Sequence, residues 1–293
     1  MTLHRVSISC GEPHVAMNEH STVGIIGLGQ IGFALARKLV NAGFQVCGFR
    51  RSHPGAFVSI GGVACESPVE LASRCGVVFL CLPSIAAQEE VLGGPRGVLR
   101  SAWSGQIFIE CGSYPLDAKR SFAQRLTQAG ATMIECEISG TPRNVESGTA
   151  TLLLAGEAKI IESLRAHFEA ISPTAFNMGE FGAALAMKTV LNALLAIQNL
   201  ASAEAMLMGT RAGLDAELIM KVVNASPVRS DVFERKARIM VSRQFQPTSG
   251  GFETFAKYLD LAENLAERIG FSPPLLRAAL PVYRTALESG RAR

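Results

Sequence analysis

The residues Thr22 to Ser52, which read TVGIIGLGQIGFALARKLVNAGFQVCGFRRS, decide the fold of the N-terminal half of this chain. An apolar run from Val23 to Ile26 leads into a glycine-rich turn, and apolar residues then continue at helical spacing from Phe33 to Val40. This order predicts a strand, a tight turn and a helix whose N-terminus binds the pyrophosphate of a dinucleotide. The residues predicted to contact the cofactor here are Gly27, Leu28, Gly29, Gln30, Ile31 and Gly32.

The GxGxxG pattern is short, and a glycine-rich turn in an ordinary α/β domain is the alternative interpretation. A second apolar segment, Gln45–Phe49, follows the helix and completes a βαβ unit, which favours dinucleotide binding. An acidic residue after this second strand is typical of NAD binding, because it accepts a hydrogen bond from the ribose 2′-hydroxyl. This chain instead has Arg50, Arg51 and Ser52, which suit a 2′-phosphate and predict NADP as the cofactor. A solvated basic turn without a ligand is the alternative.

Composition narrows the class of protein. A net charge of +3 over 293 residues is too small to favour a nucleic-acid partner, and no continuous apolar run has the roughly 18 residues of a membrane span. The seven cysteines contain no CxxC pair and the five histidines are scattered, so the sequence predicts no metal site. Cys47, Cys81 and Cys136 lie in apolar runs, where we expect small core residues in a reducing cytoplasm.

Strand-like and helical segments alternate through the first 180 or so residues, which predicts a parallel sheet with helices on both faces. The predicted strands are Val23–Leu28, Gln45–Phe49, Val77–Leu82, Gln106–Glu110, Thr132–Cys136, Thr151–Leu154 and Ala175–Met178. The predicted helices between them are Pro68–Arg74, Ile85–Leu92, Pro115–Gln128 and Ala158–Ile171.

After Gly182 the pattern becomes entirely helical. Residues Ala183 to Ala212 contain no proline and predict a helix of roughly 45 Å that joins two domains. The helices predicted to follow are Ala216–Asn224, Asp231–Val241, Phe252–Ile269 and Pro274–Leu287. We therefore expect a mobile extension at residues 1–20, a doubly wound Rossmann-type α/β domain at 21–182, and an all-α domain at 183–293. Because the helices of the second domain have little polar surface, we expect this domain to pack against another subunit in a homodimer or homotetramer.

Four motifs in this order resemble the β-hydroxyacid dehydrogenase family, which includes 3-hydroxyisobutyrate dehydrogenase and tartronate semialdehyde reductase. GLGQIG is similar to the family's cofactor loop, and VVFLCLPS at Val77–Ser84 is similar to its next strand and turn. IECEISGTPRNVESGT at Ile134–Thr149 resembles the substrate loop DAPVSGG. GEFGAALAMKTVLN at Gly179–Asn192 resembles the catalytic helix pattern GxGxxxKxxxN. The resemblance covers nearly all of the chain from Thr22 onward.

The resemblance implies that Lys188 is the general acid and base of a hydride-transfer reaction, with Asn192 as its partner. Residues four apart share one face of a helix, so both side chains can reach one substrate carbon. A lysine in a partly dry cleft has a lowered pKa and can donate or accept the proton. A solvated lysine on a long helix is the alternative for Lys188, although no acidic residue lies between Glu180 and Glu204 to pair with it.

The same resemblance assigns the remaining ligand contacts. Ser139, Gly140 and Thr141 stand in the loop that binds the carboxylate of the substrate. Ser113 occupies the position of a threonine near the nicotinamide ribose, although it could instead cap the helix that opens at Pro115. Lys257, in KYLDLA, resembles a lysine that reaches the cofactor from the second domain, and a plain exposed lysine is the alternative. The turn motif places two further residues at the cofactor, Leu82 and Pro83.

Several residues depart from the family pattern around the substrate. Thr141 replaces the second glycine of the loop, Leu191 replaces the first asparagine of a pair, and Tyr258 replaces an aspartate; Glu135, Cys136 and Glu137 replace Asp, Ala and Pro. These departures leave the hydride-transfer residues in place but predict an unusual substrate. The leading hypothesis is an NADP-dependent oxidoreductase of a small β-hydroxyacid or its semialdehyde. The alternatives are an imine reductase-like enzyme and a catalytically silent NADP-binding module.

Overall fold

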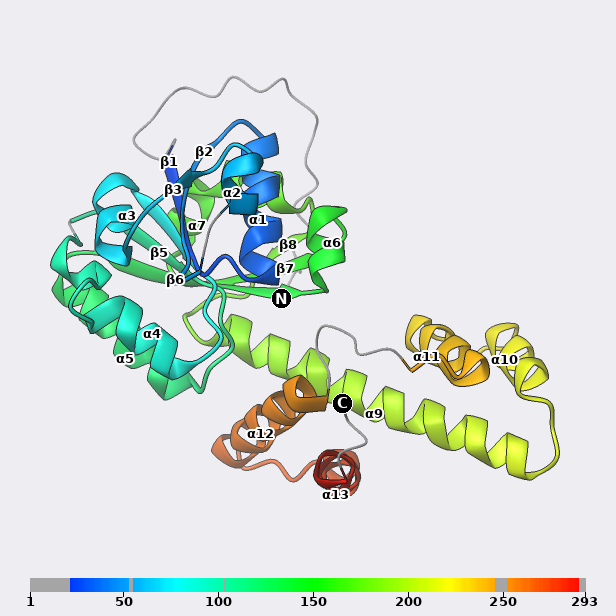
Figure 1. Ribbon diagram of the computed structural model, residues 1–293. Helices are drawn as coiled ribbons and strands as arrows, with labels where there is room; N and C mark the ends of the chain where they lie inside the picture. Colours follow the sequence, from blue (N-terminus) through cyan, green and yellow to red (C-terminus); the bar gives the residue numbers. More distant parts are fainter. Residues whose placement is uncertain (1–21, 53–54, 103, 246–251, 290–293) are drawn as a thin grey trace.

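The computed structural model describes residues 22–52, 55–102, 104–245 and 252–289. The extension predicted at residues 1–20 lies outside the described residues. Within them, an α/β domain is followed by a long helix and a helical domain (Figure 1). The predicted fold class is therefore confirmed.

The α/β domain is built on an eight-stranded sheet with the order β3-β2-β1-β4-β5-β6-β7-β8. Each pair of neighbouring strands is parallel except β6 and β7, which are antiparallel. The predicted parallel sheet thus contains one antiparallel pair, because the connection that carries α6 (Pro142–Glu146) returns the chain beside β6 in the opposite direction. The strands are β1 (Thr22–Ile26), β2 (Gln45–Phe49), β3 (Val63–Ala64), β4 (Val77–Leu80), β5 (Ile107–Glu110), β6 (Thr132–Ser139), β7 (Thr151–Ala155) and β8 (Ala175–Asn177).

Helices cover both faces of this sheet, as the alternation of segments predicted. Val77 and Phe79 of β4 pack into the core on one face, and Val78 and Leu80 into the core on the other. Alternate residues of a strand point to opposite faces, so a strand that is apolar throughout is buried on both sides. The first face carries α1 (Gln30–Asn41), α2 (Gly55–Ser59), α6 (Pro142–Glu146), α7 (Ala158–Ser163) and α8 (Arg165–Ile171). The second face carries α3 (Pro68–Arg74), α4 (Ile85–Gly93) and α5 (Leu116–Gln128).

Some short elements differ from the sequence prediction. The helix predicted over Ala158–Ile171 is two helices, because the backbone of Leu164 leaves the helical conformation at φ −99° and ψ 11°. β3, α2 and α6 were not predicted, and each has at most five residues, too few to show a hydrophobic period. A single 3₁₀ turn at Val98–Arg100 joins α4 to the strand that follows.

The long helix α9 (Ala183–Arg211) runs for 29 residues and connects the two domains (Figure 1). Its first turns pack against β6 and β7, and its later turns carry the C-terminal helices. In the described part of the chain, α9 is long and apolar enough to cross a membrane by length and composition alone. In its most apolar 18-residue stretch, 22% is buried. An interdomain helix with an uncovered apolar surface meets the same criterion.

The C-terminal helices pack on different parts of α9 (Figure 1). α12 (Phe252–Arg268) and α13 (Pro274–Glu288) share a core with Ala196 in the middle of the long helix. α10 (Ala216–Asn224) and α11 (Asp231–Ser242) pack at its far end around Met206, Phe233 and Ala237. The predicted C-terminal helices are thus present, with bounds within a residue or two of those expected.

Candidate active site

A cleft of about 1180 Å³ lies at the carboxyl ends of the central strands, where the sheet domain meets α9 and α12. In parallel sheets, ligands bind at this edge where neighbouring connections run to opposite faces of the sheet, here between β1 and β4. Among the described residues, the lining includes sixteen of the eighteen that the sequence predicted for the site; Ser139 and Asn192 are outside it. Residues from Ile26 to Tyr258, far apart in sequence, thereby meet in one cavity.

The glycine turn forms one wall of the cleft. Gly27 has a φ of +99°, and a Cβ atom on it would lie 2.3 Å from the carbonyl oxygen of Cys81. A Cβ on Gly32 would lie 2.1 Å from the carbonyl oxygen of Gly27, so the start of α1 packs directly on the turn. A Cβ on Gly29 would instead meet nothing within 4 Å, because this glycine faces the cleft. The turn therefore leaves backbone-lined space at a helix N-terminus, which fits a pyrophosphate.

Basic side chains line the cleft beyond β2. Arg50, Arg51 and Ser52 are all in the lining, as is Arg96 from the loop after α4. The guanidinium of Arg51 lies 3.9 Å from Glu90, and its side chain is 77% exposed, so this ion pair leaves it free to move. Leu82 and Pro83 line the same cavity, and the Tyr114 hydroxyl holds this turn by donating to the carbonyl oxygen of Leu82 at 2.6 Å.

The structure buries Lys188 on α9, where its side chain lines the cleft and is 7% exposed. Its Nζ donates a hydrogen bond to the carbonyl oxygen of Ile138 at 2.6 Å and lies 5.5 Å from the centre of the Tyr258 ring. Burial lowers the pKa of Lys188, and the negative charge of Glu137 partly opposes that shift. No ion pair to Lys188 is present within the described residues. The alternative of a solvated surface lysine is therefore wrong.

Asn192 lies one turn further along α9, on the same buried face as Lys188. It is 9% exposed, and its Nδ2 atom is buried without a hydrogen-bond partner. It does not line the cleft, and its predicted role beside Lys188 stays a prediction. An unpaired buried amide donor costs free energy, which favours a position where a ligand or a side-chain rotation can satisfy it.

The predicted substrate loop follows β6. Gly140 and Thr141 line the cleft, whereas Ser139, the last residue of the strand, is partly buried behind them. The hydroxyl of Thr141 donates to Oδ1 of Asn144 at 2.7 Å and caps the start of α6. This side chain, which the sequence presented as a hydroxyl for the substrate, is thus already held by a capping interaction.

Ser113 does not cap α5. The cap position is Pro115, without a side-chain hydrogen bond, so that alternative is wrong. Ser113 instead donates to Oε2 of Glu137 at 2.6 Å, and its oxygen lies 3.4 Å from the Tyr258 hydroxyl. The other oxygen of Glu137 accepts from Nζ of Lys119 at 2.6 Å, deep in the sheet domain. The departures at positions 137 and 258 therefore meet at Ser113.

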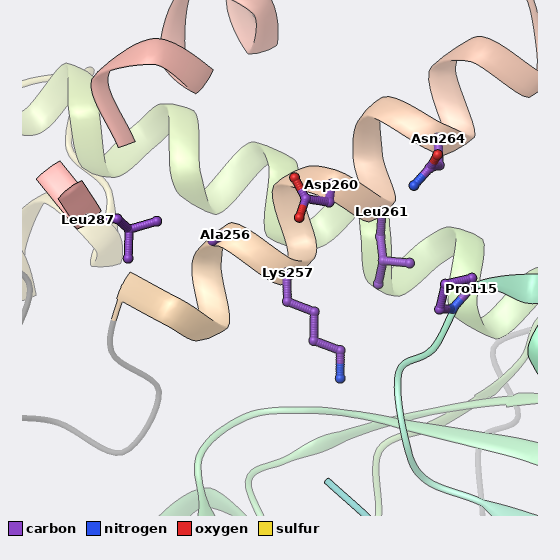
Figure 2. Close-up of a pocket in the computed structure, with 7 residues that line it drawn as sticks. All are labelled: Pro115, Ala256, Lys257, Asp260, Leu261, Asn264 and Leu287. Carbon is purple, nitrogen blue, oxygen red and sulfur yellow. The ribbon is translucent and has the colours of Figure 1, made fainter. Parts of the chain in front are cut away.

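Lys257 reaches the cleft from the second domain. It lies on α12, and its side chain extends away from that helix toward the strands (Figure 2). Its Nζ sits 5.2 Å from the centre of the Tyr114 ring, and burial lowers its pKa. Its side chain is partly buried, so it is not a plain exposed lysine. A smaller cavity of about 480 Å³ adjoins it, between Pro115, α12 and the end of α13.

Comparison with known proteins agrees with this geometry. Residues 22–179 match the family model described as "NAD binding domain of 6-phosphogluconate dehydrogenase", and residues 182–293 match "NAD-binding of NADP-dependent 3-hydroxyisobutyrate dehydrogenase". An L-threonate dehydrogenase from Cupriavidus necator is 31% identical over 92% of this chain and 91% of the relative. The chain belongs to the β-hydroxyacid dehydrogenase family.

Other members of this family are similar along their whole length. An NAD-dependent L-serine dehydrogenase from Pseudomonas aeruginosa is 29% identical over 92% of this chain and 93% of the relative. The crystal structure of 3-hydroxyisobutyrate dehydrogenase from Salmonella typhimurium superposes with a TM-score of 0.81, at 24% identity over 92% and 95% of the two chains. These similar proteins are dehydrogenases that act on CH–OH groups. The sheet domain of this family member is an NAD(P)-binding domain.

Sequence reasoning missed part of the candidate site of this family member. Glu137 and Tyr258 appeared only as departures from the family pattern, yet both line the cleft, as does Arg96. Two acidic residues at alternate positions of a buried strand, Glu135 and Glu137, were the available signal, because buried carboxylates need partners. Cys81 was expected in the core with Cys47 and Cys136, but only the latter two are buried; Cys81 borders the cleft.

Proposed function

We propose that the protein is an NADP-preferring dehydrogenase or reductase of a small β-hydroxyacid or its semialdehyde, with Lys188 as the general acid and base. The observation that carries this proposal is the position of Lys188. It is buried, it lacks an ion-pair partner in the described residues, and it faces the same cleft as the glycine turn. A lysine is costly to bury, so this position favours a role in proton transfer.

The residues of the cleft divide the chemistry between them. The turn at Gly27–Gly32 and the cations after β2 would hold the cofactor, whose nicotinamide supplies or accepts the hydride when bound. In the oxidation direction, neutral Lys188 accepts the proton of the substrate hydroxyl; in reduction, its ammonium donates that proton to the carbonyl oxygen. The Ile138 carbonyl fixes the direction of the amine. The backbone amide of Gly140 would bind the carboxylate, because that of Thr141 already donates to Oδ1 of Asn144 at 2.9 Å.

The test of this role is the variant Lys188→Ala. We expect NADPH affinity to stay close to that of the parent protein. Turnover of any hydroxyacid that the parent protein oxidises should fall by about 10²- to 10⁴-fold, which is the usual contribution of a positioned acid or base to the rate. Titration followed by the fluorescence of NADPH measures the affinity, and initial rates measure the turnover. Lys159→Ala, in which the removed lysine lies outside the cleft, serves as the control. Undiminished turnover in Lys188→Ala would remove Lys188 from the mechanism.

The preference for NADP rests on the positions of Arg50, Arg51 and Ser52 at the end of β2. Guanidinium groups pair well with phosphate, and no acidic residue stands at the position that would accept from a free 2′-hydroxyl. The C-terminal match to an NADP-dependent 3-hydroxyisobutyrate dehydrogenase family supports this choice, whereas the Pseudomonas relative is NAD-dependent. The choice between NADP and NAD therefore rests on the residues at the end of β2 rather than on overall similarity to the relatives.

We expect NADPH to bind more tightly than NADH, and the double variant Arg50→Ala/Arg51→Ala to narrow that gap by about tenfold or more, because charge-assisted hydrogen bonds to the 2′-phosphate are lost. NADH affinity should change little. Isothermal titration of both cofactors measures the effect, and Arg165→Ala, an arginine paired with Glu162 outside the cleft, is the control. Equal affinities for the two cofactors in the parent protein would contradict the 2′-phosphate site.

We also propose that the helical domain forms a homodimer or homotetramer. α10 has no buried residue, and Leu218 and Val222 on it are 52% and 58% exposed. On the neighbouring end of α9, Leu207 and Met208 are 55% and 73% exposed. Exposed apolar side chains gathered on neighbouring helices are typical of an interface between subunits.

A further inference from the structure

Three cysteines lie side by side on neighbouring strands at the edge of the cleft. Cys81 directly follows β4, Cys111 directly follows β5, and Cys136 lies within β6. The residues that precede them are in register across both strand pairs, so the three cysteines are neighbours in turn. Adjacent strands are about 4.8 Å apart, and the Cα atoms of a disulfide are about 4.4–6.8 Å apart. The backbone therefore spaces each neighbouring pair for a disulfide.

The central sulfur of this row, that of Cys111, is hydrogen-bonded from both sides. All three side chains pack on the face of the sheet that carries α1. There the thiols of Cys136 and Cys81 hydrogen-bond to Cys111 and lower its pKa, as does the charge of Lys119, whereas burial and the charge of Glu137 oppose that shift. The same hydrogen bonds raise the pKa values of Cys81 and Cys136. Because the thiolate is the nucleophilic form of cysteine, Cys111 is the most reactive sulfur in the row.

The cleft gives access to two of the three sulfurs. Cys81 and Cys111 line it and are partly exposed, whereas Cys136 is 0% exposed and outside the lining. Cys136 is also fixed within β6, where it pairs with Leu154 of β7. Cys81 stands beyond the end of its strand and has more freedom to move. A small reagent in the cleft therefore reaches Cys111, and Cys81 is the neighbour placed to react with it next.

Cys81 also supports the turn that fits the cofactor pyrophosphate. Its amide donates to the carbonyl oxygen of Ile26 at 2.8 Å. Its carbonyl oxygen would lie 2.3 Å from a Cβ atom on Gly27, and its own Cβ would lie 3.2 Å from one on Gly32. Closely packed groups leave no space to absorb a displacement. A disulfide that pulls Cys81 toward Cys111 must therefore move the glycine turn.

We propose that Cys111 and Cys81 form an oxidation site: a hydroperoxide oxidises Cys111, the disulfide between Cys81 and Cys111 forms, and the displaced glycine turn binds the cofactor more weakly. In the reduced protein, a bound cofactor covers both sulfurs and protects them from the oxidant. The oxidation site uses only the NAD(P)-binding domain, so it stands independently of the substrate and of the role of Lys188.

The chemistry balances in two steps. The Cys111 thiolate attacks one oxygen of the hydroperoxide, the O–O bond breaks, and the departing alkoxide or hydroxide takes a proton from water. This two-electron oxidation leaves a sulfenic acid on Cys111. The sulfur of Cys81 then attacks the sulfenic sulfur, the S–O bond breaks, and the released hydroxide leaves as water with the thiol proton of Cys81. In total, two thiols and one hydroperoxide give one disulfide, one alcohol or water, and one further water.

The test treats the full-length protein with hydrogen peroxide and maps disulfides in unreduced tryptic peptides by mass spectrometry. We expect the linked peptides to be those of Cys81 and Cys111. Saturation with NADPH or NADH, whichever binds more tightly, should slow the linkage to the rate set by the fraction of protein that is free of cofactor. After oxidation, the affinity for the same cofactor should fall by about tenfold or more, within the usual range of coupling between two sites. Dithiothreitol should restore it.

Two variants separate the steps. In Cys81→Ser, the sulfenic acid of Cys111 should persist and react with dimedone, and no disulfide to Cys111 should form. In Cys111→Ser, peroxide should neither link the peptides nor change the cofactor affinity relative to the same variant before treatment. The measurements on the parent protein test the oxidation site even where a variant fails to fold.

A second group of thiols provides the matched control. Cys47 is hydrogen-bonded by Cys65 and Cys75, as Cys111 is by its two neighbours, but none of these three cysteines lines the cleft. Cys47→Ser should therefore keep the peroxide response of the parent protein.

The mapping and the affinities can each overturn the proposal. Failure of peroxide to link Cys81 with Cys111, a disulfide to Cys136 in its place, an oxidation rate that does not depend on bound cofactor, or unchanged cofactor affinity after oxidation would contradict the oxidation site. A loss of affinity in treated Cys111→Ser equal to that of the parent protein would trace the effect to other thiols and overturn the site too.

Discussion

At the scale of single residues, two opposing effects set the pKa of Lys188 in the cleft. Desolvation favours the neutral amine and lowers its pKa, while the carboxylate of Glu137 favours the ammonium and raises it. The two effects oppose each other, and desolvation is the larger. Lys188 is therefore poised to change its protonation state below the ordinary range of a lysine, where it can accept or donate a proton.

This balance predicts the pH dependence of the reaction. Oxidation needs neutral Lys188, so kcat/KM for oxidation should fall as the pH drops through the pKa of Lys188. Reduction needs the ammonium, so its kcat/KM should fall as the pH rises through the same pKa. In Glu137→Gln the charge that raises this pKa is absent, and both limbs should move to lower pH. Initial rates across pH in both directions measure the limbs.

The control for this shift is Glu135→Gln, because Glu135 is bound by Lys119 and the backbone amide of Gly182 and does not line the cleft. Limbs that stay at the same pH in Glu137→Gln would contradict the coupling between residues 137 and 188. Limbs that move equally in both variants would instead indicate a general change in the buried charges.

At this scale, the sequence predicted contacts between residues that are close together in the chain and missed contacts between residues that are far apart. Lys188 and Asn192 share a helix face, so their proximity followed from spacing alone. The contacts of Ser113 with Glu137 and Tyr258 cross 24 and 145 residues, and no local pattern indicates which buried polar groups will meet over such separations. Glu137 and Tyr258 were visible in the sequence as departures from the family pattern, but only the fold shows that both contact Ser113.

At the scale of elements, the predictions succeeded where a hydrophobic period had room to develop. The long strands, α1 and α9 each contain enough residues to show which faces are apolar. β3 has two residues and α6 has five, and α6 depends on a capping box at Thr141 rather than on an apolar stripe. The reversal between β6 and β7 was missed because alternation of strands and helices predicts parallel neighbours.

The turn between β1 and α1 gives a prediction that separates folding from binding. Gly32→Ala places a methyl group against the backbone of Gly27, so we expect the free energy of unfolding to fall by about 1–3 kcal/mol. Gly29→Ala places its methyl group in open space, so the free energy of unfolding should change by less than about 1 kcal/mol. NADPH affinity should nevertheless fall in Gly29→Ala, because the methyl group takes the space of the pyrophosphate.

Denaturant unfolding without cofactor and NADPH titration of the same two variants measure both effects. The pair serves as its own control, because each variant adds one methyl group to the same loop. Normal NADPH affinity in Gly29→Ala would contradict the placement of the pyrophosphate at this helix N-terminus.

At the scale of the whole molecule, the far end of α9 is covered more thinly than its middle, where α12 and α13 pack. α10 and α11 share a core with it that has three buried residues in the described structure, Met206, Phe233 and Ala237. These elements project away from the sheet domain (Figure 1). A core of that size offers little hydrophobic free energy against the entropy of ordering three helices. A second copy of the chain that covers the apolar surface would supply the missing burial.

The corresponding prediction is a change of mass in solution. The parent protein should elute as two or four times the 31.2 kDa chain mass in light scattering after size exclusion. Leu218 and Val222 are one turn apart on α10, so Leu218→Glu/Val222→Glu places two charges on one face and should shift the protein to monomers with a lower unfolding temperature. Gln124→Glu/Gln128→Glu on the exposed face of α5 adds the same charge elsewhere and should leave the mass unchanged. A monomeric parent protein would show that α10 remains uncovered, and a parent-like mass for the α10 variant would place the interface on another surface.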